Sequence, residues 1–190
     1  MKLIIVHSAP GCGKSTVAAK LHEHYKSPWF EFGWIPEFRN LNPFTELPCA
    51  LEEQISFENL VLVAQNYIGH GFENVLLSDL NDIRILDIAK QFRDTAHIIL
   101  TLYSEDEDVI KERVLTRENG NTYKDWEQAI AINRIIRGRP PLPNEYRIRT
   151  DAQDAEQVTK QAIELIERHS PRLNEDLAER RREEFFSYTD

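Results

Sequence analysis

The chain has 190 residues, of which 41% are hydrophobic and 29% are charged. This mixture is typical of globular domains and excludes collagen-like, low-complexity and wholly disordered chains; at about 150 residues per domain, the length fits one domain better than two. Lys and Arg number 23 against 32 Asp and Glu, a net charge of −9, which argues against a nucleic-acid partner and against an anionic membrane surface.

The first apolar run, Leu3–Val6, is too short for the core of a signal peptide or for a membrane span, and the polar His7 and Ser8 interrupt it. The two cysteines, Cys12 and Cys49, form no CxxC pair and no metal-ligand spacing. We therefore predict a cytoplasmic protein with no membrane association, no structural disulfide and no zinc site.

Short β-type apolar runs alternate along the chain with longer segments of helical periodicity, a pattern typical of an α/β fold with a mainly parallel sheet. The predicted strands are Lys2–His7, Pro28–Phe32, Asn74–Asp79, His97–Tyr103 and Tyr146–Thr150. The predicted helices are Lys14–Tyr25, a long helix within Leu51–Ile68, Asn81–Phe92, one reaching Arg117, one reaching Arg137, and one ending at Ser170-Pro171.

Two of these helices have capping signals before them. Ser104 with Glu107, and Thr122 with Asp125, have the spacing of a capping box and predict the helices that reach Arg117 and Arg137.

The last 21 residues are highly charged and contain an Arg-Arg-Arg-Glu-Glu run followed by two phenylalanines. We predict a charged helical tail over residues 170–190, whose apolar side chains dock either on the domain or on a second subunit of a homo-oligomer. The preceding residues 1–169 are predicted to form a single domain.

The segment from Val6 to Thr16, VHSAPGCGKST, follows the first predicted strand and opens the first predicted helix. It resembles a phosphate-binding P-loop, in which backbone N–H groups and a helix N-terminus solvate a polyphosphate. The predicted nucleotide-binding residues are Pro10, Gly11, Cys12, Gly13, Lys14, Ser15 and Thr16. Lys14 would reach the β- and γ-phosphates, and Ser15 would ligate Mg²⁺.

Two features of this loop leave alternatives open. Ser8 stands where the motif G-x-x-x-x-G-K-[ST] has its first glycine, and a helix-capping turn with an incidental lysine would give a similar sequence. Cys12 is either a small side chain that contributes its backbone N–H or a redox-sensitive thiol, because a helix N-terminus lowers a thiol pKa.

The run Val75–Asp79 is an apolar strand that ends in an acid and resembles the Walker B pattern. Asp79 at the carboxyl end of a strand would face the ligand crevice and hold Mg²⁺ through water. The alternative is that Asp79 caps the next helix.

Arg113 and Arg117 are four residues apart near the end of a predicted helix, so that both guanidinium groups share one face. With the P-loop, a short second strand and an acidic end to the third, this pattern resembles the small P-loop kinases. That family includes nucleoside-monophosphate, shikimate and gluconate kinases and chloramphenicol phosphotransferase. The resemblance covers about Met1–His169, and only the P-loop matches at high specificity.

The resemblance implies a three-layer P-loop NTPase fold, with a five-stranded parallel sheet in the order 2-3-1-4-5 and helices on both faces. It also implies that Arg113 stacks on the adenine. Arg117 would belong to a short lid, about residues 117–125, that touches the transferring phosphoryl group.

The family has further arginines near the lid that neutralise charge in the transition state. By this resemblance, Arg137 is assigned to catalysis and Arg134 to the substrate, with Arg139 as a further candidate. Asp151 is assigned to the nucleotide, because it lies where these kinases surround the adenine with backbone atoms.

In this family the acceptor binds at the end of the second strand and in the helices after it. A carboxylate there deprotonates the acceptor hydroxyl, a role open to Glu31 or Glu37. Arg39 would hold an acidic group of the acceptor, and Trp34 would stack on a ring. Phe38 and Phe44 are further stacking candidates at the same end of the chain. The alternatives are that these aromatic residues are core and that the acids are surface charges.

Together these patterns predict an ATP- or GTP-using, Mg²⁺-dependent kinase that transfers a γ-phosphoryl group to a small molecule, such as a nucleoside, nucleotide or hydroxylated metabolite. One alternative is a polynucleotide 5′-hydroxyl kinase, on account of the arginines between Arg134 and Arg149. The other is a nucleotide-binding switch or ATPase whose charged tail engages a partner.

Overall fold

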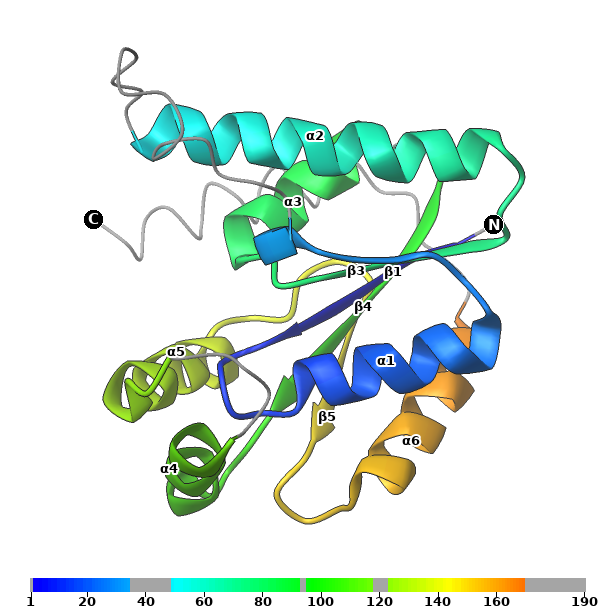
Figure 1. Cartoon of the computed structure of the whole chain (residues 1–190). Helices are drawn as coiled ribbons and strands as arrows, with labels where there is room; N and C mark the ends of the chain where they lie inside the picture. Colours follow the sequence, from blue (N-terminus) through cyan, green and yellow to red (C-terminus); the bar gives the residue numbers. More distant parts are fainter. Residues whose placement is uncertain (1, 35–48, 93–94, 118–122, 170–190) are drawn as a thin grey trace.

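The computed structural model describes residues 2–34, 49–92, 95–117 and 123–169 (Figure 1). Its sheet has five strands in the order β2-β3-β1-β4-β5, and every neighbouring pair is parallel. The strands are β1 (Lys2–Ser8), β2 (Trp29–Glu31), β3 (Asn74–Ser78), β4 (Ala96–Tyr103) and β5 (Glu145–Arg149). The predicted α/β class and sheet order are therefore confirmed.

Helices cover both faces of this sheet and complete three layers (Figure 1). They are α1 (Lys14–Tyr25), α2 (Cys49–Gly69), α3 (Asp82–Gln91), α4 (Glu107–Thr116), α5 (Trp126–Gly138) and α6 (Ala155–Arg168), with a 3-10 turn, η1 (Phe32–Trp34). Alternate residues of β1 divide the core, because side chains alternate along a strand. Leu3 and Ile5 pack with α2 and α3, and Ile4 and Val6 pack with α1, α4, α5 and α6.

The helix starts differ in detail from the prediction. Asp106, and not Ser104, is the N-cap of α4, and its carboxylate accepts hydrogen bonds from first-turn N–H groups. Ser104 instead donates its hydroxyl to the Asp106 carbonyl oxygen at 2.7 Å. Asp125 caps α5 in the same way as Asp106 caps α4, and Thr122 lies outside the described residues. A carboxylate closer to the first turn thus takes the place predicted for a hydroxyl.

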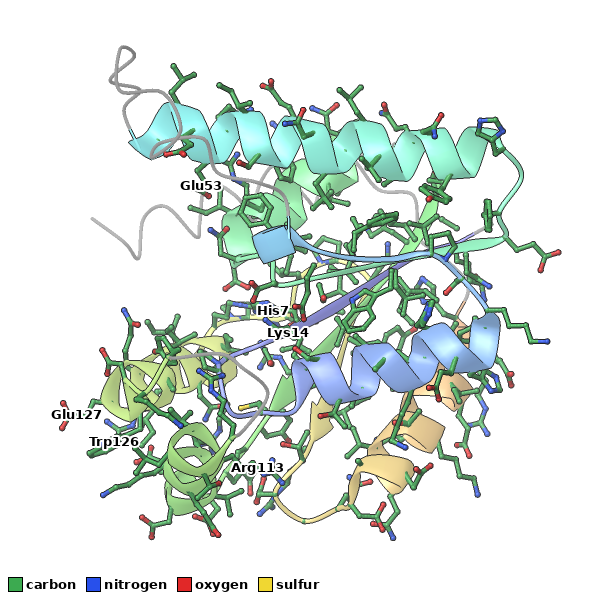
Figure 2. The ribbon with its side chains drawn as sticks, in the orientation of Figure 1. His7, Lys14, Glu53, Arg113, Trp126 and Glu127 are labelled. Carbon is green, nitrogen blue, oxygen red and sulfur yellow. The ribbon has the colours of Figure 1, made fainter. Side chains whose placement is uncertain are left out.

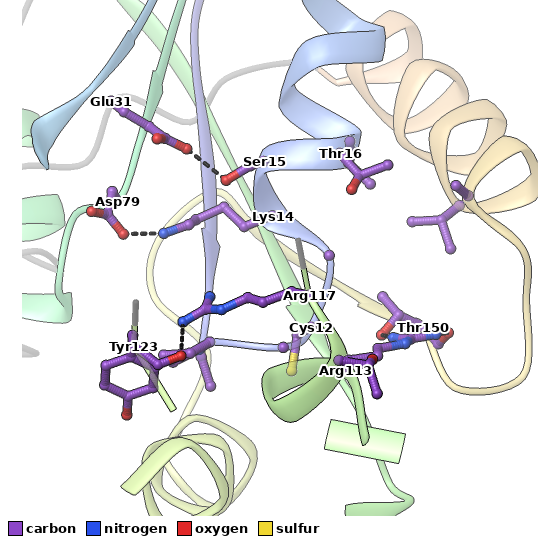
Figure 3. Close-up of a pocket in the computed structure, with 18 of the residues that line it drawn as sticks. Cys12, Lys14, Ser15, Thr16, Glu31, Asp79, Arg113, Arg117, Tyr123 and Thr150 are labelled. Atoms are coloured by element: carbon purple, nitrogen blue, oxygen red, sulfur yellow. Dashed lines mark hydrogen bonds and ion pairs between the residues drawn. The ribbon is translucent and has the colours of Figure 1, made fainter. Parts of the chain in front are cut away.

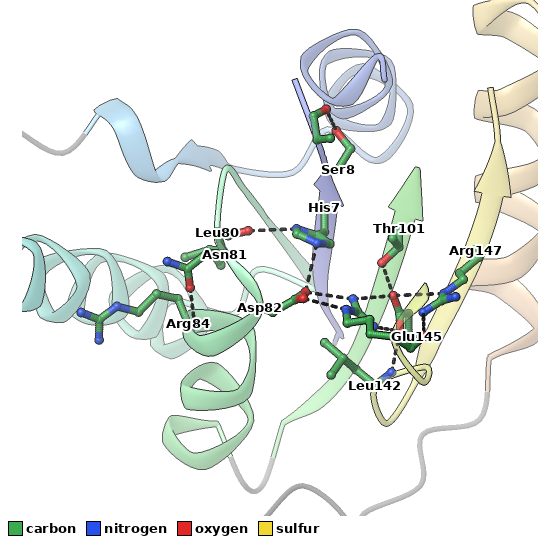
Figure 4. A network of polar contacts seen from close by, with 12 residues as sticks. His7, Ser8, Leu80, Asn81, Asp82, Arg84, Thr101, Leu142, Glu145 and Arg147 are labelled. Carbon is green, nitrogen blue, oxygen red and sulfur yellow. Dashed lines mark hydrogen bonds and ion pairs between the residues drawn. The ribbon is translucent and has the colours of Figure 1, made fainter. Parts of the chain in front are cut away.

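A buried network of charged side chains lies between β1, α3 and the start of β5 (Figure 4). Arg139 donates to Asp82 at 2.6 Å and to Glu145 at 2.8 Å, and His7 lies 3.1 Å from Asp82. The Arg139, Asp82 and Glu145 side chains are 6%, 6% and 0% exposed. Arg139 is therefore neutralised inside the protein and is not at the site where the kinase resemblance would use it.

The two carboxyl groups of this network remain ionised for a clear reason. Burial alone would raise the pKa of Asp82, but hydrogen bonds and charges from His7 and Arg139 lower it. The pKa of Glu145 is lowered by Arg139 in the same way, against the effect of burial.

Within the described residues, no helix is both long and apolar enough to cross a bilayer.

We expect Arg139→Met to lower the free energy of unfolding by about 3–5 kcal/mol, because it leaves two buried carboxylates without their cation. Arg134→Met is the matched control. Arg134 pairs with Glu107 on the surface, where it is 65% exposed, so its loss should change the stability much less than the loss of Arg139, because solvent screens the pair. Urea unfolding at pH 7 measures both, and equal effects would contradict a structural role for the network.

The same pair of variants has an expected pH dependence. The folded pKa values of Asp82 and Glu145 lie below their ordinary values of 3.8 and 4.5. The stability from their pairing is thus complete above about pH 4.5 and is lost as the pH falls through the folded values. In Arg139→Met, burial without the Arg139 charge would raise the pKa of both carboxyl groups, so the folded variant takes up protons at a higher pH than wild type does. The gap between wild type and Arg139→Met should therefore narrow progressively as the pH falls below 7.

Candidate active site

A cavity of about 750 Å³ lies at the carboxyl ends of the central strands, where β1 passes into α1 (Figure 3). This is where open α/β sheets bind ligands, and the volume falls in the usual range for small-molecule sites. Its lining comes from three regions of the fold: residues 9–17, Glu31 with Asp79, and a group formed by Arg113, Thr116, Arg117, Tyr123, Thr150, Gln153, Ala155 and Val158.

Two glycines shape the loop at the base of this cavity. Gly11 and Gly13 have φ values of 82° and 89°, a left-handed region that other residues rarely adopt. A Cβ on Gly11 would also lie 3.0 Å from both the Ile110 carbonyl oxygen and Val114 Cγ2 of α4. Gly13 is the N-cap of α1 and provides no side-chain cap, so the first N–H groups of α1 remain available to an anion.

Cys12 belongs to the loop, and its side chain packs into the core. Its side chain is fully buried, and Sγ contacts Asn133 Oδ1 at 3.6 Å. Asn133 in turn bonds both the N–H and the carbonyl of Ser104. Burial raises the pKa of the Cys12 thiol to about 12, the opposite of what a redox-sensitive thiol requires. This geometry supports the structural interpretation of Cys12. Ser8, at the missing glycine, lies outside the cavity lining.

Two carboxylates meet the P-loop side chains from the neighbouring strands (Figure 3). The Lys14 ammonium contacts the Asp79 carboxylate, and Ser15 Oγ donates to Glu31 Oε1 at 2.7 Å. Asp79 follows β3 with a φ of 66°. Lys14 lies near the centre of the molecule, whereas Glu127 projects from its edge (Figure 2). The predicted metal residues Ser15 and Asp79 thus line one cavity, with Glu31 beside them.

This set of oxygen atoms fits Mg²⁺. Mg²⁺ is usually held by one or two protein oxygens, with water and substrate phosphates filling the other positions. Ser15, Asp79 and Glu31 supply such oxygens beside the Lys14 ammonium. The described part of the chain contains no cluster of three or more His, Cys, Asp or Glu that could hold a metal without a substrate.

The other end of the cavity contains two arginines, Arg113 of α4 and Arg117, the residue that follows α4. Arg113 Nη2 donates to the Thr150 carbonyl at 3.1 Å. Arg117 Nη2 donates to the Tyr123 carbonyl at 2.6 Å, and its guanidinium lies 5.3 Å from the centroid of the Tyr123 ring. The predicted pair therefore converges on the same cavity as the P-loop.

Asp151 is close to this end but does not line the cavity. It accepts hydrogen bonds from Arg149 and from the Glu105 N–H, and the bond from Arg149 is the main reason that its pKa falls to about 2. Thr150 and Gln153 line the cavity in its place. The resemblance pointed to this segment through its backbone atoms, and the side chains that line the cavity there are those of Thr150 and Gln153.

Several other predicted residues are not brought to the cavity or cannot be placed. Arg134 is paired with Glu107, Arg137 is exposed on α5, and neither lines the cavity. Trp34 ends η1. Four predicted acceptor residues lie outside the described residues: Glu37, Phe38, Arg39 and Phe44.

No protein-family model matches the chain, and no curated protein matches it. Solved structures do. A sugar kinase from Janibacter sp. HTCC2649 has a TM-score of 0.63 at 17% identity, covering 88% of this chain and 95% of that chain. A gluconokinase from Sinorhizobium meliloti 1021 has a TM-score of 0.62 at 16% identity, covering 88% and 92%.

The APS kinase of Mycobacterium tuberculosis, solved with AMPPNP and APS, has a TM-score of 0.56 at 17% identity, covering 87% of this chain and 97% of that chain. The similarity at these identities concerns the fold. This chain has the P-loop kinase fold, as the sequence resemblance predicted.

The burial of Cys12 gives a test of its role. In a Cys49→Ser variant, which leaves Cys12 alone, we expect iodoacetamide at pH 8 to react roughly 10³-fold more slowly than with a free cysteine, because almost no thiolate is present. Unfolding in urea should restore the ordinary rate. Rapid labelling of the folded protein that nucleotide prevents would instead support a redox-sensitive thiol.

Proposed function

We propose that this protein is an ATP- and Mg²⁺-dependent phosphotransferase that acts on a small hydroxylated acceptor. The observation that carries the proposal is the convergence, on one cavity, of a P-loop with an uncapped helix N-terminus, Lys14, the carboxylates Glu31 and Asp79, and Arg113 with Arg117. The sugar kinase, gluconokinase and APS kinase that share the fold support the same reaction class.

The P-loop end of the cavity would bind the triphosphate. Backbone N–H groups of residues 11–16 hydrogen-bond the phosphate oxygens, and Lys14 exchanges its contact with Asp79 for the β- and γ-phosphates. Ser15 and Asp79 would hold the metal. Bound Mg²⁺ supplies a positive charge that polarises the γ-phosphoryl group and offsets charge on the leaving oxygen. Arg117 would stabilise the charge on the transferring group.

Glu31 is the carboxylate best placed to act as general base. It ends β2 and accepts the Ser15 hydroxyl at 2.7 Å. A carboxylate has further lone pairs besides the one that accepts the Ser15 hydroxyl, so Glu31 would still be able to accept the proton of an acceptor hydroxyl. The acceptor oxygen then bonds to the γ-phosphorus as the bond from that phosphorus to the β-phosphate oxygen breaks, and ADP leaves. Glu37 remains the second candidate for this role.

The polynucleotide alternative loses the observation that favoured it. Four of its five arginines, all but the exposed Arg137, have other partners. Arg134 is bound to Glu107, Arg139 to Asp82, and Arg149 to Asp151. Arg147 donates to the carbonyls of residues 137 and 139. These side chains do not form an open basic track for a phosphate backbone.

The proposal predicts that Lys14→Ala lowers ADP formation with any accepted substrate by roughly 10²- to 10³-fold, because it removes a fixed charge next to the transferring phosphoryl group. Lys20→Ala is the matched control. Lys20 is on the same helix but pairs with Glu156 on the surface, so its activity should stay within about twofold of wild type.

A screen of sugars, sugar acids, nucleosides and nucleotides, read by ADP release, provides the substrate for this comparison. Calorimetry with Mg·ATP tests the binding step independently of the acceptor. If wild type binds neither ATP nor GTP in the presence of Mg²⁺, the proposed function is wrong.

Glu31→Gln should separate binding from chemistry. We expect kcat to fall roughly 10²-fold while the Kd for Mg·ATP changes little, because the amide cannot accept the acceptor proton. Glu23→Gln, an exposed site on α1, serves as the control. An unchanged kcat in Glu31→Gln would transfer the general-base role to another residue.

A further inference from the structure

Gln153 lies at the end of the cavity formed by Arg113, Thr150, Ala155 and Val158. It lies between β5 and α6, four residues after the last residue of β5. The proposed function leaves this end of the cavity for the nucleotide base, since the P-loop binds the phosphates. The chemistry of the Gln153 side chain therefore decides which base fits there.

The Gln153 amide is held in a fixed orientation. Its Nε2 donates to the Arg149 carbonyl oxygen at 2.9 Å and to Gln161 Oε1 at 3.3 Å. A carbonyl oxygen has no hydrogen, so the atom that faces it must be the amide nitrogen. Both amide hydrogens are thereby used, one for each partner.

This orientation leaves Gln153 Oε1 as an acceptor with no partner among the described residues. The neighbouring polar groups are already engaged. The Thr150 hydroxyl donates to the Tyr103 carbonyl and accepts from Arg113, and the Thr150 carbonyl accepts from Arg113. Gln153 thus offers a side-chain acceptor to a base at this end of the cavity.

We propose that Gln153, locked by Gln161, makes the site specific for adenine over guanine nucleotides, by accepting a hydrogen bond from the adenine 6-amino group. Adenine carries an N–H donor at this position, whereas guanine carries an oxygen acceptor there. Guanine would therefore place one acceptor against another. This inference rests on the proposed function, because it assumes that the cavity binds a nucleoside triphosphate.

The described carboxylates near this end of the cavity are not placed to pair with a guanine base. A guanine base is best matched by a carboxylate that accepts its N1 and N2 hydrogens. The nearest acids in sequence are Asp154, which caps α6, and Asp151, which is bound to Arg149 and to the Glu105 N–H, and neither lines the cavity. A buried guanine edge would keep unpaired donors, which is costly.

The test uses calorimetry with three Mg²⁺-bound triphosphates: ATP, GTP and purine riboside triphosphate, which is ATP without the 6-amino group. Wild type should bind ATP roughly 5- to 10-fold more tightly than the purine analogue, the worth of one neutral hydrogen bond. It should bind GTP at least tenfold more weakly than ATP, because guanine also leaves donors unpaired.

Variants identify the residue responsible. Gln153→Met should weaken ATP to the affinity of the purine analogue and leave the analogue itself unchanged. Gln161→Met removes the hydrogen bond that orients the Gln153 amide but does not change a group that contacts the ligand. It should therefore reduce the preference for ATP over GTP, measured as the ratio of their Kd values, several-fold. Gln91→Met, the same change at an exposed site at the end of α3, should alter none of the three affinities. Thermal unfolding checks that each variant is folded.

Equal binding of ATP and the purine analogue to wild type would overturn this assignment, and that comparison needs no variant. An equal loss of both ligands in Gln153→Met would also overturn it, because the side chain would then act through the shape of the loop. If no triphosphate binds wild type, the proposed function fails as well. If all three bind with equal affinity, the proposed function survives and only the adenine specificity is wrong.

Discussion

The close approach of the Gly11 backbone to α4 is the constraint on which the site depends. A Cβ at Gly11 would lie 3.0 Å from the Ile110 carbonyl oxygen and from Val114, so the loop and the helix are in contact without an intervening side chain. This contact determines where α4 presents Arg113 and Arg117 relative to the N-terminus of α1. The loop backbone and the cationic side chains are thereby held at a fixed separation, and under the proposed function this preorganises the cavity for an anion.

The arginines of this acidic protein differ in what neutralises them. Arg139 is buried between two carboxylates and serves the fold, and Arg134 is matched by Glu107 on the surface. Arg113 is held by the carbonyl and hydroxyl oxygens of Thr150, which are neutral. A neutral partner orients the guanidinium and leaves its charge available to a ligand. The net charge of −9 therefore says little about the potential inside the cavity.

The sequence predicted those parts of the structure that depend on residues close together in the chain. Strand and helix periodicity and the contiguous Gly11–Thr16 loop were enough for the class and the phosphate end, while the sheet order came from family resemblance. The assignment of Arg134 and Arg137 depended on how α5 rotates about its axis, which Asn133 and Ile136 decide by facing the core. Gln153, for which we propose a role in base selection, carries no sequence signal, because its orientation depends on the Arg149 carbonyl and on Gln161, and no local pattern encodes the contact with Gln161.

Under the proposed function, the charges at the P-loop end of the cavity give a reason for a divalent cation. Lys14 contributes one positive charge there, while Glu31 and Asp79 contribute two negative charges. Adding a triphosphate alone would place its charges against two carboxylates in a partly buried site, where repulsion is stronger than in water. A Mg²⁺ ion between them turns this repulsion into attraction. Asp79 contacts Lys14, and Glu31 accepts the Ser15 hydroxyl. Under the proposed function, nucleotide and metal would therefore exchange partners with groups that are already ordered.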